Sequence, residues 1–286
     1  MTGIDFGRVA VLGAGTMGAG IAQICAAAGS KVALYDIETN LVEAGVGRVR
    51  DFLAKGVEKG KTRPEERDAL LANLRATSDL RDATADADLV VEAIPEKLDL
   101  KQRVFAEVAA VCTPATVLAS NTSSLSLADV FAEVPARERC LGMHFFNPPP
   151  LMPLLELVRT EQTSEATLQR VLAYAGRLGK EPIVVKDSPG FATSRLGVVL
   201  GLEAIRMLEA GVASAADIDK AMELGYRHPM GPLRLTDLVG LDVRLSIADY
   251  LRDKLDSPAF AAPKLMRDMV AAGKLGKKSG QGFYKW

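Results

Sequence analysis

A glycine pattern close to the N-terminus restricts the fold of this chain more than any other feature. An apolar run, Val9-Ala10-Val11-Leu12, leads directly into Gly13-Ala14-Gly15-Thr16-Met17-Gly18. The first glycine permits a tight turn, the second lets the backbone approach a pyrophosphate, and the third lets a helix pack closely on the strand. Phosphates would then lie at the helix N-terminus, where N–H groups and the helix dipole favour anions. The segment therefore predicts a strand, a dinucleotide-binding turn and a helix.

An acidic residue at the end of the next apolar run strengthens this interpretation. Asp36 follows Lys31-Val32-Ala33-Leu34-Tyr35, eighteen residues after Gly18, and a ribose-binding carboxylate is expected at about 20 residues. Such a carboxylate would repel a 2′-phosphate, and Ile37-Glu38 supplies no basic side chain to bind one. The pattern predicts NAD as the cofactor. The simpler alternative for Asp36 is a solvated acid at the end of a strand.

Short apolar runs alternate with amphipathic helical segments up to about residue 185. This alternation predicts an α/β domain of the Rossmann type, with a mostly parallel sheet covered by helices on both faces. From Leu41 to Leu74 two helical segments around Gly60 and Pro64 interrupt it and predict an inserted helical hairpin. The basic residues of the hairpin are Lys55, Lys59 and Lys61. They form either a solvated face or a clasp for a phosphate-bearing ligand.

The strand pattern disappears after Lys186-Asp187-Ser188-Pro189-Gly190, a sequence typical of a domain boundary. We expect an NAD-binding domain over residues 1–186 and an all-α domain over residues 187–286 that forms the dimer interface and part of the substrate cleft. The helix expected over 191–210 is apolar on most of its circumference, which predicts a homodimer through this domain. Further helices are expected over 214–224, 233–255 and 261–272.

Composition and charge narrow the possible partners. Of 286 residues, 48% are hydrophobic and 25% charged, and the net charge is -1, so neither nucleic acid nor a membrane is expected as a partner. Residues 1–8 lack the pattern of an export signal, and the most apolar helix is too short for a bilayer, which predicts a cytoplasmic protein. The spacing of Cys25, Cys112 and Cys140 argues against a disulfide framework and against a metal site.

Two histidines are present, and a histidine is the side chain that exchanges protons near neutral pH. His144 ends an apolar run, residues 148–150 are prolines that force a turn, and Glu156 lies in a second apolar run twelve residues further on. Two short strands joined by this turn would bring imidazole and carboxylate together. The alternative is a core histidine bound to a backbone carbonyl. His228 is interpreted as a loop residue because Pro and Gly follow it.

The predicted cofactor makes His144 the better candidate for a proton acceptor. A nicotinamide moves a hydride, and the protein must supply the group that takes the proton. In an open α/β sheet the ligand lies beyond the carboxyl ends of the strands, where we expect both His144 and Ser120-Asn121-Thr122-Ser123-Ser124. We expect the latter cluster to supply hydroxyl and amide donors beside the cofactor. The alternative is a cap for the helical segment expected from Leu125, and the two roles are compatible.

A series of motifs follows along almost the whole chain. They are residues 13–18, 90–94, 119–124, 143–148, 186–191, 228–232 and 276–284. In this order they resemble the L-3-hydroxyacyl-CoA dehydrogenase family, most of all its short bacterial 3-hydroxybutyryl-CoA dehydrogenases. The resemblance implies an enzyme that uses NAD to interconvert a 3-hydroxyacyl-CoA, such as 3-hydroxybutyryl-CoA, and the corresponding 3-ketoacyl-CoA.

The resemblance also implies roles for individual residues. His144 matches the catalytic base, Glu156 its partner, and Ser123 the hydroxyl that holds the substrate oxygen. Where the family usually has an asparagine before the arginine, this chain has Ser194 before Arg195. The serine keeps a hydroxyl but lacks the reach of the amide, so we expect it to affect substrate placement.

Other residues match positions that line the cofactor and substrate cleft. Such positions are occupied by Glu96, Lys101 and Asn147. Asn147 also matches a residue that contacts the substrate oxygen. Lys59 falls near a position that contacts the CoA moiety, and Lys278 near one associated with cofactor binding. Two alternatives remain on the same fold. They are a dehydrogenase of a free hydroxy acid, such as L-gulonate or carnitine, and a non-catalytic structural protein of the lens crystallin kind.

Overall fold

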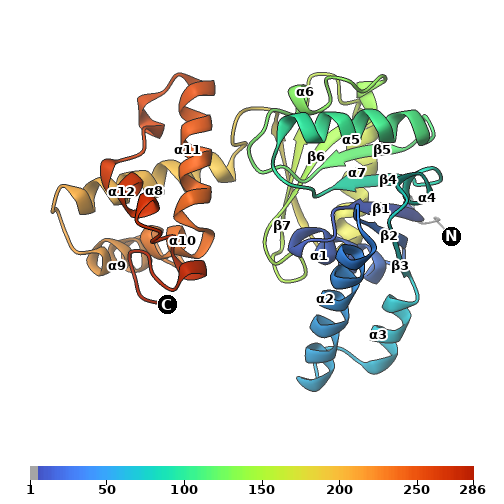
Figure 1. Ribbon diagram of the computed structural model, residues 1–286, viewed down its shortest axis with the longest axis horizontal. Helices are drawn as coiled ribbons and strands as arrows, with labels where there is room; N and C mark the ends of the chain where they lie inside the picture. Colours follow the sequence, from blue (N-terminus) through green and yellow to red (C-terminus); the bar gives the residue numbers. More distant parts are fainter. Residues whose placement is uncertain (1–5) are drawn as a thin grey trace. The chain divides into compact units, whose positions relative to one another are not determined.

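The computed structural model describes residues 6–286, in two compact units divided between Asp187 and Ser188 (Figure 1). The boundary predicted after residue 186 lies one residue earlier. Residues 1–5, part of the segment in which no export signal is predicted, lie outside the described residues. Over residues 6–286, no helix is long and apolar enough to cross a membrane, and no group of His, Cys, Asp or Glu side chains is arranged to hold a metal ion.

An eight-stranded sheet forms the centre of the first unit, with the order β3-β2-β1-β4-β5-β6-β7-β8. Neighbouring strands are parallel except β6 and β7, which confirms the mostly parallel sheet. The chain order reverses between β1 and β4, the point where such sheets bind ligands beyond the strand ends. The strands are β1 (Arg8–Leu12), β2 (Lys31–Tyr35), β3 (Leu74–Thr77), β4 (Leu89–Glu92), β5 (Val117–Ser120), β6 (Cys140–Phe145), β7 (Leu154–Arg159) and β8 (Glu181–Lys186).

Helices cover this sheet from both sides. Side chains of α1, α2, α3 and α7 pack in one apolar cluster with alternate residues of the strands, whereas α4 packs on β1 and β2 and contacts α5. Helices α2 and α3 form the predicted hairpin and extend away from the sheet (Figure 1). The helices are α1 (Thr16–Ala27), α2 (Thr39–Glu58), α3 (Pro64–Leu71), α4 (Leu80–Thr84), α5 (Leu98–Val111), α6 (Leu127–Val130), the 3-10 turn η1 (Arg137–Arg139) and α7 (Glu165–Arg177).

The two edge strands are absent from the sequence-based expectations. β3 is Leu-Arg-Ala-Thr, four residues without an apolar run, and it falls at the end of the segment expected to be helical. β8 has exposed and half-buried side chains only. Central strands such as β4 and β5 are buried on both faces, and their sequences are therefore mostly apolar. Edge strands are less buried, so their sequences lack this pattern.

The second unit is helical, as predicted, with short bridges near its C-terminal end. Its core includes Val198, Leu202 and Leu251. The single helix expected over 233–255 is wrong, because Gly240 has φ 107 and separates two helices there. The elements are α8 (Thr193–Glu209), α9 (Ala215–Gly225), α10 (Pro232–Val239), α11 (Leu241–Leu255), η2 (Pro258–Phe260), α12 (Lys264–Ala271) and η3 (Lys277–Ser279).

Candidate active site

The glycine turn between β1 and α1 has the geometry that the motif predicts. A Cβ on Gly13, where φ is 96, would lie 2.6 Å from the Ala93 carbonyl oxygen, and a Cβ on Gly18 would lie 1.7 Å from the Gly13 carbonyl oxygen. A Cβ on Gly15 would meet no atom within 4 Å. Gly13 and Gly18 are therefore required by the fold, whereas Gly15 keeps space open in front of the turn.

The first turn of α1 is suited to an anion. The helix begins at Thr16, and its N-cap is Gly15, which has no side chain to accept hydrogen bonds from the first N–H groups of the helix. Gly15 and Thr16 are exposed and Met17 is half-buried. N–H groups at a helix N-terminus together with the helix dipole favour a phosphate there. The residues present thus fit the pyrophosphate of a dinucleotide.

Asp36 lies against the same turn. Its carboxylate accepts hydrogen bonds from the N–H of Ala14 at 2.7 Å and of Ile37 at 2.8 Å. Arg48 of α2, which the sequence did not single out, donates to the Ala14 carbonyl at 2.9 Å. The carboxylate therefore stands at the carboxyl end of β2 beside the turn, where a ribose hydroxyl of a dinucleotide would be bound.

His144 and Glu156 form a buried pair between β6 and β7. The two residues are directly opposite in the antiparallel register, and Nδ1 of His144 lies 2.8 Å from Oε2 of Glu156. His144 is 6% exposed and Glu156 is 0% exposed. A carboxylate on Nδ1 orients an imidazole ring and sets its tautomer, which leaves proton exchange to the other ring nitrogen, Nε2. The spacing of the two residues in the sequence predicts this contact.

Replacing Glu156 by glutamine should lower kcat by ~10²-fold or more, since the amide retains a hydrogen bond to His144 but loses the charge that stabilises an imidazolium and can fix the wrong tautomer of the ring. Glu156 is fully buried, and the isosteric change keeps the packing. The measurement is steady-state kinetics at saturating substrates, with thermal unfolding to show that the fold is retained. Unchanged kcat in a folded variant would remove Glu156 from the mechanism.

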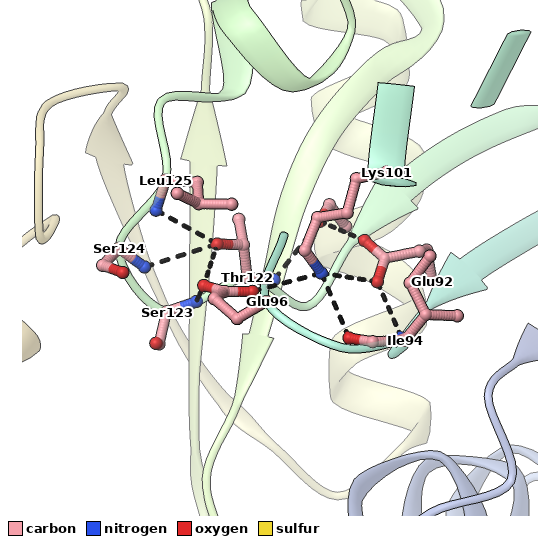
Figure 2. A network of polar contacts seen from close by, with 9 residues as sticks. Glu92, Ile94, Glu96, Lys101, Thr122, Ser123, Ser124 and Leu125 are labelled. Atoms are coloured by element: carbon pink, nitrogen blue, oxygen red, sulfur yellow. Dashed lines mark hydrogen bonds and ion pairs between the residues drawn. The ribbon is translucent and has the colours of Figure 1, made fainter. Parts of the chain in front are cut away.

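Ser123 lies in a turn that follows β5. The Oγ1 atom of Thr122 accepts hydrogen bonds from the N–H of Ser124 at 3.4 Å and of Leu125 at 3.1 Å (Figure 2). The cap of the next helix, α6, is Ser126, which accepts a hydrogen bond from the Asp129 N–H. The alternative of a helix cap formed by residues 120–124 is therefore wrong, and these residues form a turn.

Asn121 connects this turn to the strand that carries His144. Its Oδ1 accepts a hydrogen bond from the N–H of Phe145 at 2.8 Å, and its own N–H donates to the Glu92 carbonyl at 2.8 Å. The carboxyl ends of β4, β5 and β6 are thus linked through one residue. Ser123 and His144 both lie at this edge of the sheet.

Glu96 and Lys101 are in contact with each other. The Lys101 ammonium lies 3.1 Å from Oε2 of Glu96 and 2.6 Å from Oε1 of Glu92. The Glu96 side chain is 39% exposed, whereas the Lys101 side chain is 1% exposed. Glu92 is not among the residues predicted from the sequence, because its contact with Lys101 depends on the register of β4 and β5 and on the face that α5 turns to the sheet.

The loop between β6 and β7 holds Asn147, which is exposed and precedes a cis peptide bond to Pro148. Lys180, which is not among the residues predicted from the sequence, donates to the carbonyls of Pro149 at 2.6 Å and Met152 at 2.7 Å. Burial lowers the pKa of Lys180. The loop is therefore held in place beside the end of β6.

The remaining predicted residues are distributed over both units. Lys59 is the exposed C-cap residue of α2, at the end of the hairpin with exposed Lys55 and Lys61. In the second unit, Ser194 is half-buried in the first turn of α8, and the Lys278 ammonium lies 2.6 Å from the Asp242 carboxylate. His228 lies in the loop between α9 and α10.

Comparison with known proteins gives consistent matches over the described chain. Residues 8–188 match the family model "3-hydroxyacyl-CoA dehydrogenase, NAD binding domain", and residues 190–286 match "3-hydroxyacyl-CoA dehydrogenase, C-terminal domain". The chain is 47% identical over 281 residues to a 3-hydroxybutyryl-CoA dehydrogenase of Mycobacterium tuberculosis, covering 98% of each. It is 42% identical to a probable 3-hydroxybutyryl-CoA dehydrogenase of Bacillus subtilis, covering 99% of this chain and 98% of the relative.

A solved structure has the same fold. The (S)-3-hydroxybutyryl-CoA dehydrogenase of Ralstonia eutropha superposes with a TM-score of 0.94 at 40% identity, covering 98% of this chain and 99% of that one. The similarity therefore extends over both units, each of which also matches a family model of its own.

Proposed function

The chain belongs to the 3-hydroxyacyl-CoA dehydrogenase family, and from this membership we propose that it interconverts (S)-3-hydroxybutyryl-CoA and acetoacetyl-CoA with NAD. The observation that carries the proposal is the buried His144–Glu156 pair, in which Nδ1 of His144 lies 2.8 Å from Oε2 of Glu156. The pair lies near the end of β6, in the sheet whose strand β1 leads into the glycine turn. The names of the relatives support the four-carbon acyl group. A proton carrier and a dinucleotide site on one sheet are what the reaction requires.

The proposed mechanism uses few side chains. A bound NAD would supply the hydride acceptor for C3 of the substrate, and NADH would supply the hydride donor in the reverse direction. The glycine turn, Asp36 and Glu96 would hold this cofactor, with Lys278 as a further contact. His144 takes the hydroxyl proton at its imidazole during oxidation and gives it back during reduction, while Glu156 holds the ring.

The substrate contacts are proposed from the same set. The Ser123 hydroxyl and the Asn147 amide hold the substrate oxygen in this scheme, and Ser194 contributes to substrate placement. General acid and base catalysis needs the oxygen within hydrogen-bonding reach of the base. Among residues 6–286, no hydrogen bond occupies the Ser123 hydroxyl, which is consistent with that role.

An assay of NADH absorbance with acetoacetyl-CoA tests the proposal. We expect NADH consumption that depends on both compounds. A free hydroxy acid dehydrogenase would instead act on the substrate without CoA, and a structural protein would consume no NADH. Lack of turnover with acetoacetyl-CoA at saturating NADH would contradict the proposed function.

A charge change at the basic end of the hairpin tests whether the substrate carries CoA, because only a CoA substrate would contact this region. Changing Lys59 to Glu should raise KM for acetoacetyl-CoA about fivefold or more, because a phosphate then faces a carboxylate in place of an ammonium. Turnover of free acetoacetate should not change. Lys31→Glu, at the amino end of β2 and exposed, is the matched control. Equal effects of the two variants would argue against a CoA contact at Lys59.

The second unit is proposed to form a homodimer. Its apolar side chains include several that are exposed, such as Leu196 at 67% and Leu224 at 73%. A subunit interface would bury such side chains. Sedimentation at micromolar concentration should give twice the chain mass of 30.5 kDa. A particle with the mass of one chain would exclude the dimer.

The proposed compartment is the cytoplasm. Cys25, Cys112 and Cys140 are free. Unpaired thiols are common where the environment is reducing.

A further inference from the structure

A buried ion pair lies behind the Ser123 turn, and the proposed reaction does not use it directly. Glu92 ends β4, Lys101 belongs to α5, and the side chains are 0% and 1% exposed. Lys101 Nζ lies 2.6 Å from Oε1 of Glu92. Two charges are buried without a large net cost only where each is paired and hydrogen bonded.

The Glu92 carboxylate has a full set of partners. The Ser120 hydroxyl donates to Oε2 at 2.6 Å, and the Ile94 N–H donates to Oε1 at 2.8 Å. Burial raises the pKa of Glu92, and the Lys101 ammonium together with these two donors opposes that shift. Ser120 is opposite Glu92 in the register of β4 and β5, so the pair is tied to the carboxyl ends of both strands.

Glu96 connects the buried pair to the turn. Its Oε2 lies 3.1 Å from the Lys101 ammonium. Its other oxygen, Oε1, accepts hydrogen bonds from the Ser123 N–H at 3.1 Å and from the Thr122 hydroxyl. Figure 2 shows this series of contacts, which runs from Glu92 through Lys101 and Glu96 to the turn.

We propose that the Glu92–Lys101 pair is a positioning device for Ser123, which acts by holding the Glu96 carboxylate beneath the Thr122–Ser123 turn. The inference rests on the role proposed above for the Ser123 hydroxyl. Glu96 is 39% exposed, and a solvated carboxylate without the ammonium would sample several rotamers. A misplacement of about 1 Å at a group that orients a substrate can cost ~10²-fold in rate. Lys101 is in this view a buried support, since its ammonium is occupied by two carboxylates.

A double-mutant cycle between Lys101 and Ser123 tests the proposal. The variants are Lys101→Met, Ser123→Ala and the combination, and the quantity is kcat for acetoacetyl-CoA reduction at saturating NADH. With Ser123 present, Lys101→Met should lower kcat by about 10- to 100-fold. In the Ser123→Ala background the same change should alter kcat less than about twofold, because no hydroxyl remains to be misplaced.

Two further variants keep the test decisive. Lys101→Met leaves Glu92 buried without its cation and can lower stability, so Glu96→Ala breaks the connection while the buried pair stays intact. Glu96→Ala should show the same dependence on Ser123 as Lys101→Met. Lys97→Met changes an exposed lysine one helical turn away and should keep kcat within about twofold. Saturating NADH removes any effect on cofactor affinity from kcat.

The outcomes separate this proposal from the proposed function. If Lys101→Met and Glu96→Ala lower kcat by the same factor with and without Ser123, or leave kcat unchanged, the positioning role is wrong while the enzyme assignment stands. If Ser123→Ala alone retains full kcat, the role of Ser123 fails and this proposal fails with it. If the unaltered protein does not consume NADH with acetoacetyl-CoA, the proposed function itself is wrong.

Discussion

Replacing His144 by glutamine is expected to lower kcat for acetoacetyl-CoA reduction by ~10²- to 10⁴-fold, the contribution typical of a general acid or base. Glutamine can still donate a hydrogen bond to Glu156, which lies 2.8 Å from the imidazole in the unaltered protein. It cannot take up and return a proton near neutral pH. The fold should therefore survive while proton transfer is lost, and stopped assays with excess enzyme would measure the residual rate.

The other histidine supplies the control for this experiment. His228 lies in the loop between α9 and α10 and is half-buried, so His228→Gln should leave kcat unchanged. The NADH dissociation constant of His144→Gln, measured by fluorescence titration, should also stay close to that of the unaltered protein. Near-normal turnover in His144→Gln would show that another group carries the proton.

The second large effect is expected at Gly18. An alanine Cβ there would lie 1.7 Å from the Gly13 carbonyl oxygen, a backbone atom that cannot move without opening the turn. The free energy of unfolding should fall by about 3 kcal/mol, at the upper end of the range for overpacking. NADH binding should be lost as well, because the turn and the start of α1 shift together. Chemical denaturation and fluorescence titration measure the two effects.

Gly15 and Gly47 give the contrasts that interpret this result. Gly15→Ala meets no protein atom within 4 Å, so it should keep stability but weaken NADH binding, because its Cβ occupies the space in front of the turn. Gly47, within α2, also has open space, and Gly47→Ala should stabilise the helix by roughly 0.5–1 kcal/mol. If Gly15→Ala bound NADH as tightly as the unaltered protein, the turn would not be the pyrophosphate site.

Features that depend on neighbours in the sequence were predictable. The glycine turn, Asp36 and the helical hairpin each follow from residues within one segment, and the His144–Glu156 contact follows from two strands joined by a short loop. The mostly parallel sheet follows from repeated apolar runs. Apart from the pairing of the two strands on either side of that loop, these predictions needed no knowledge of which strand pairs with which.

The Glu92–Lys101 pair shows why the rest was not predictable. Its geometry depends on the register that sets Glu92 opposite Ser120 and on the face that α5 turns to the sheet. A single sequence reveals neither. Gly240 shows another limit, since a glycine inside an apolar helical pattern does not reveal whether its φ is positive.

The His144–Glu156 contact affects the register in which β6 and β7 pair. Every residue of β6 is buried, so the strand has no polar face to mark the correct register. A slip by one residue would place His144 opposite Leu155 or Leu157 and turn Glu156 to the other face of the sheet. Two polar side chains would then be buried without each other, at a cost of several kcal/mol. The two side chains proposed to handle the proton therefore also specify the alignment of the strands that hold them.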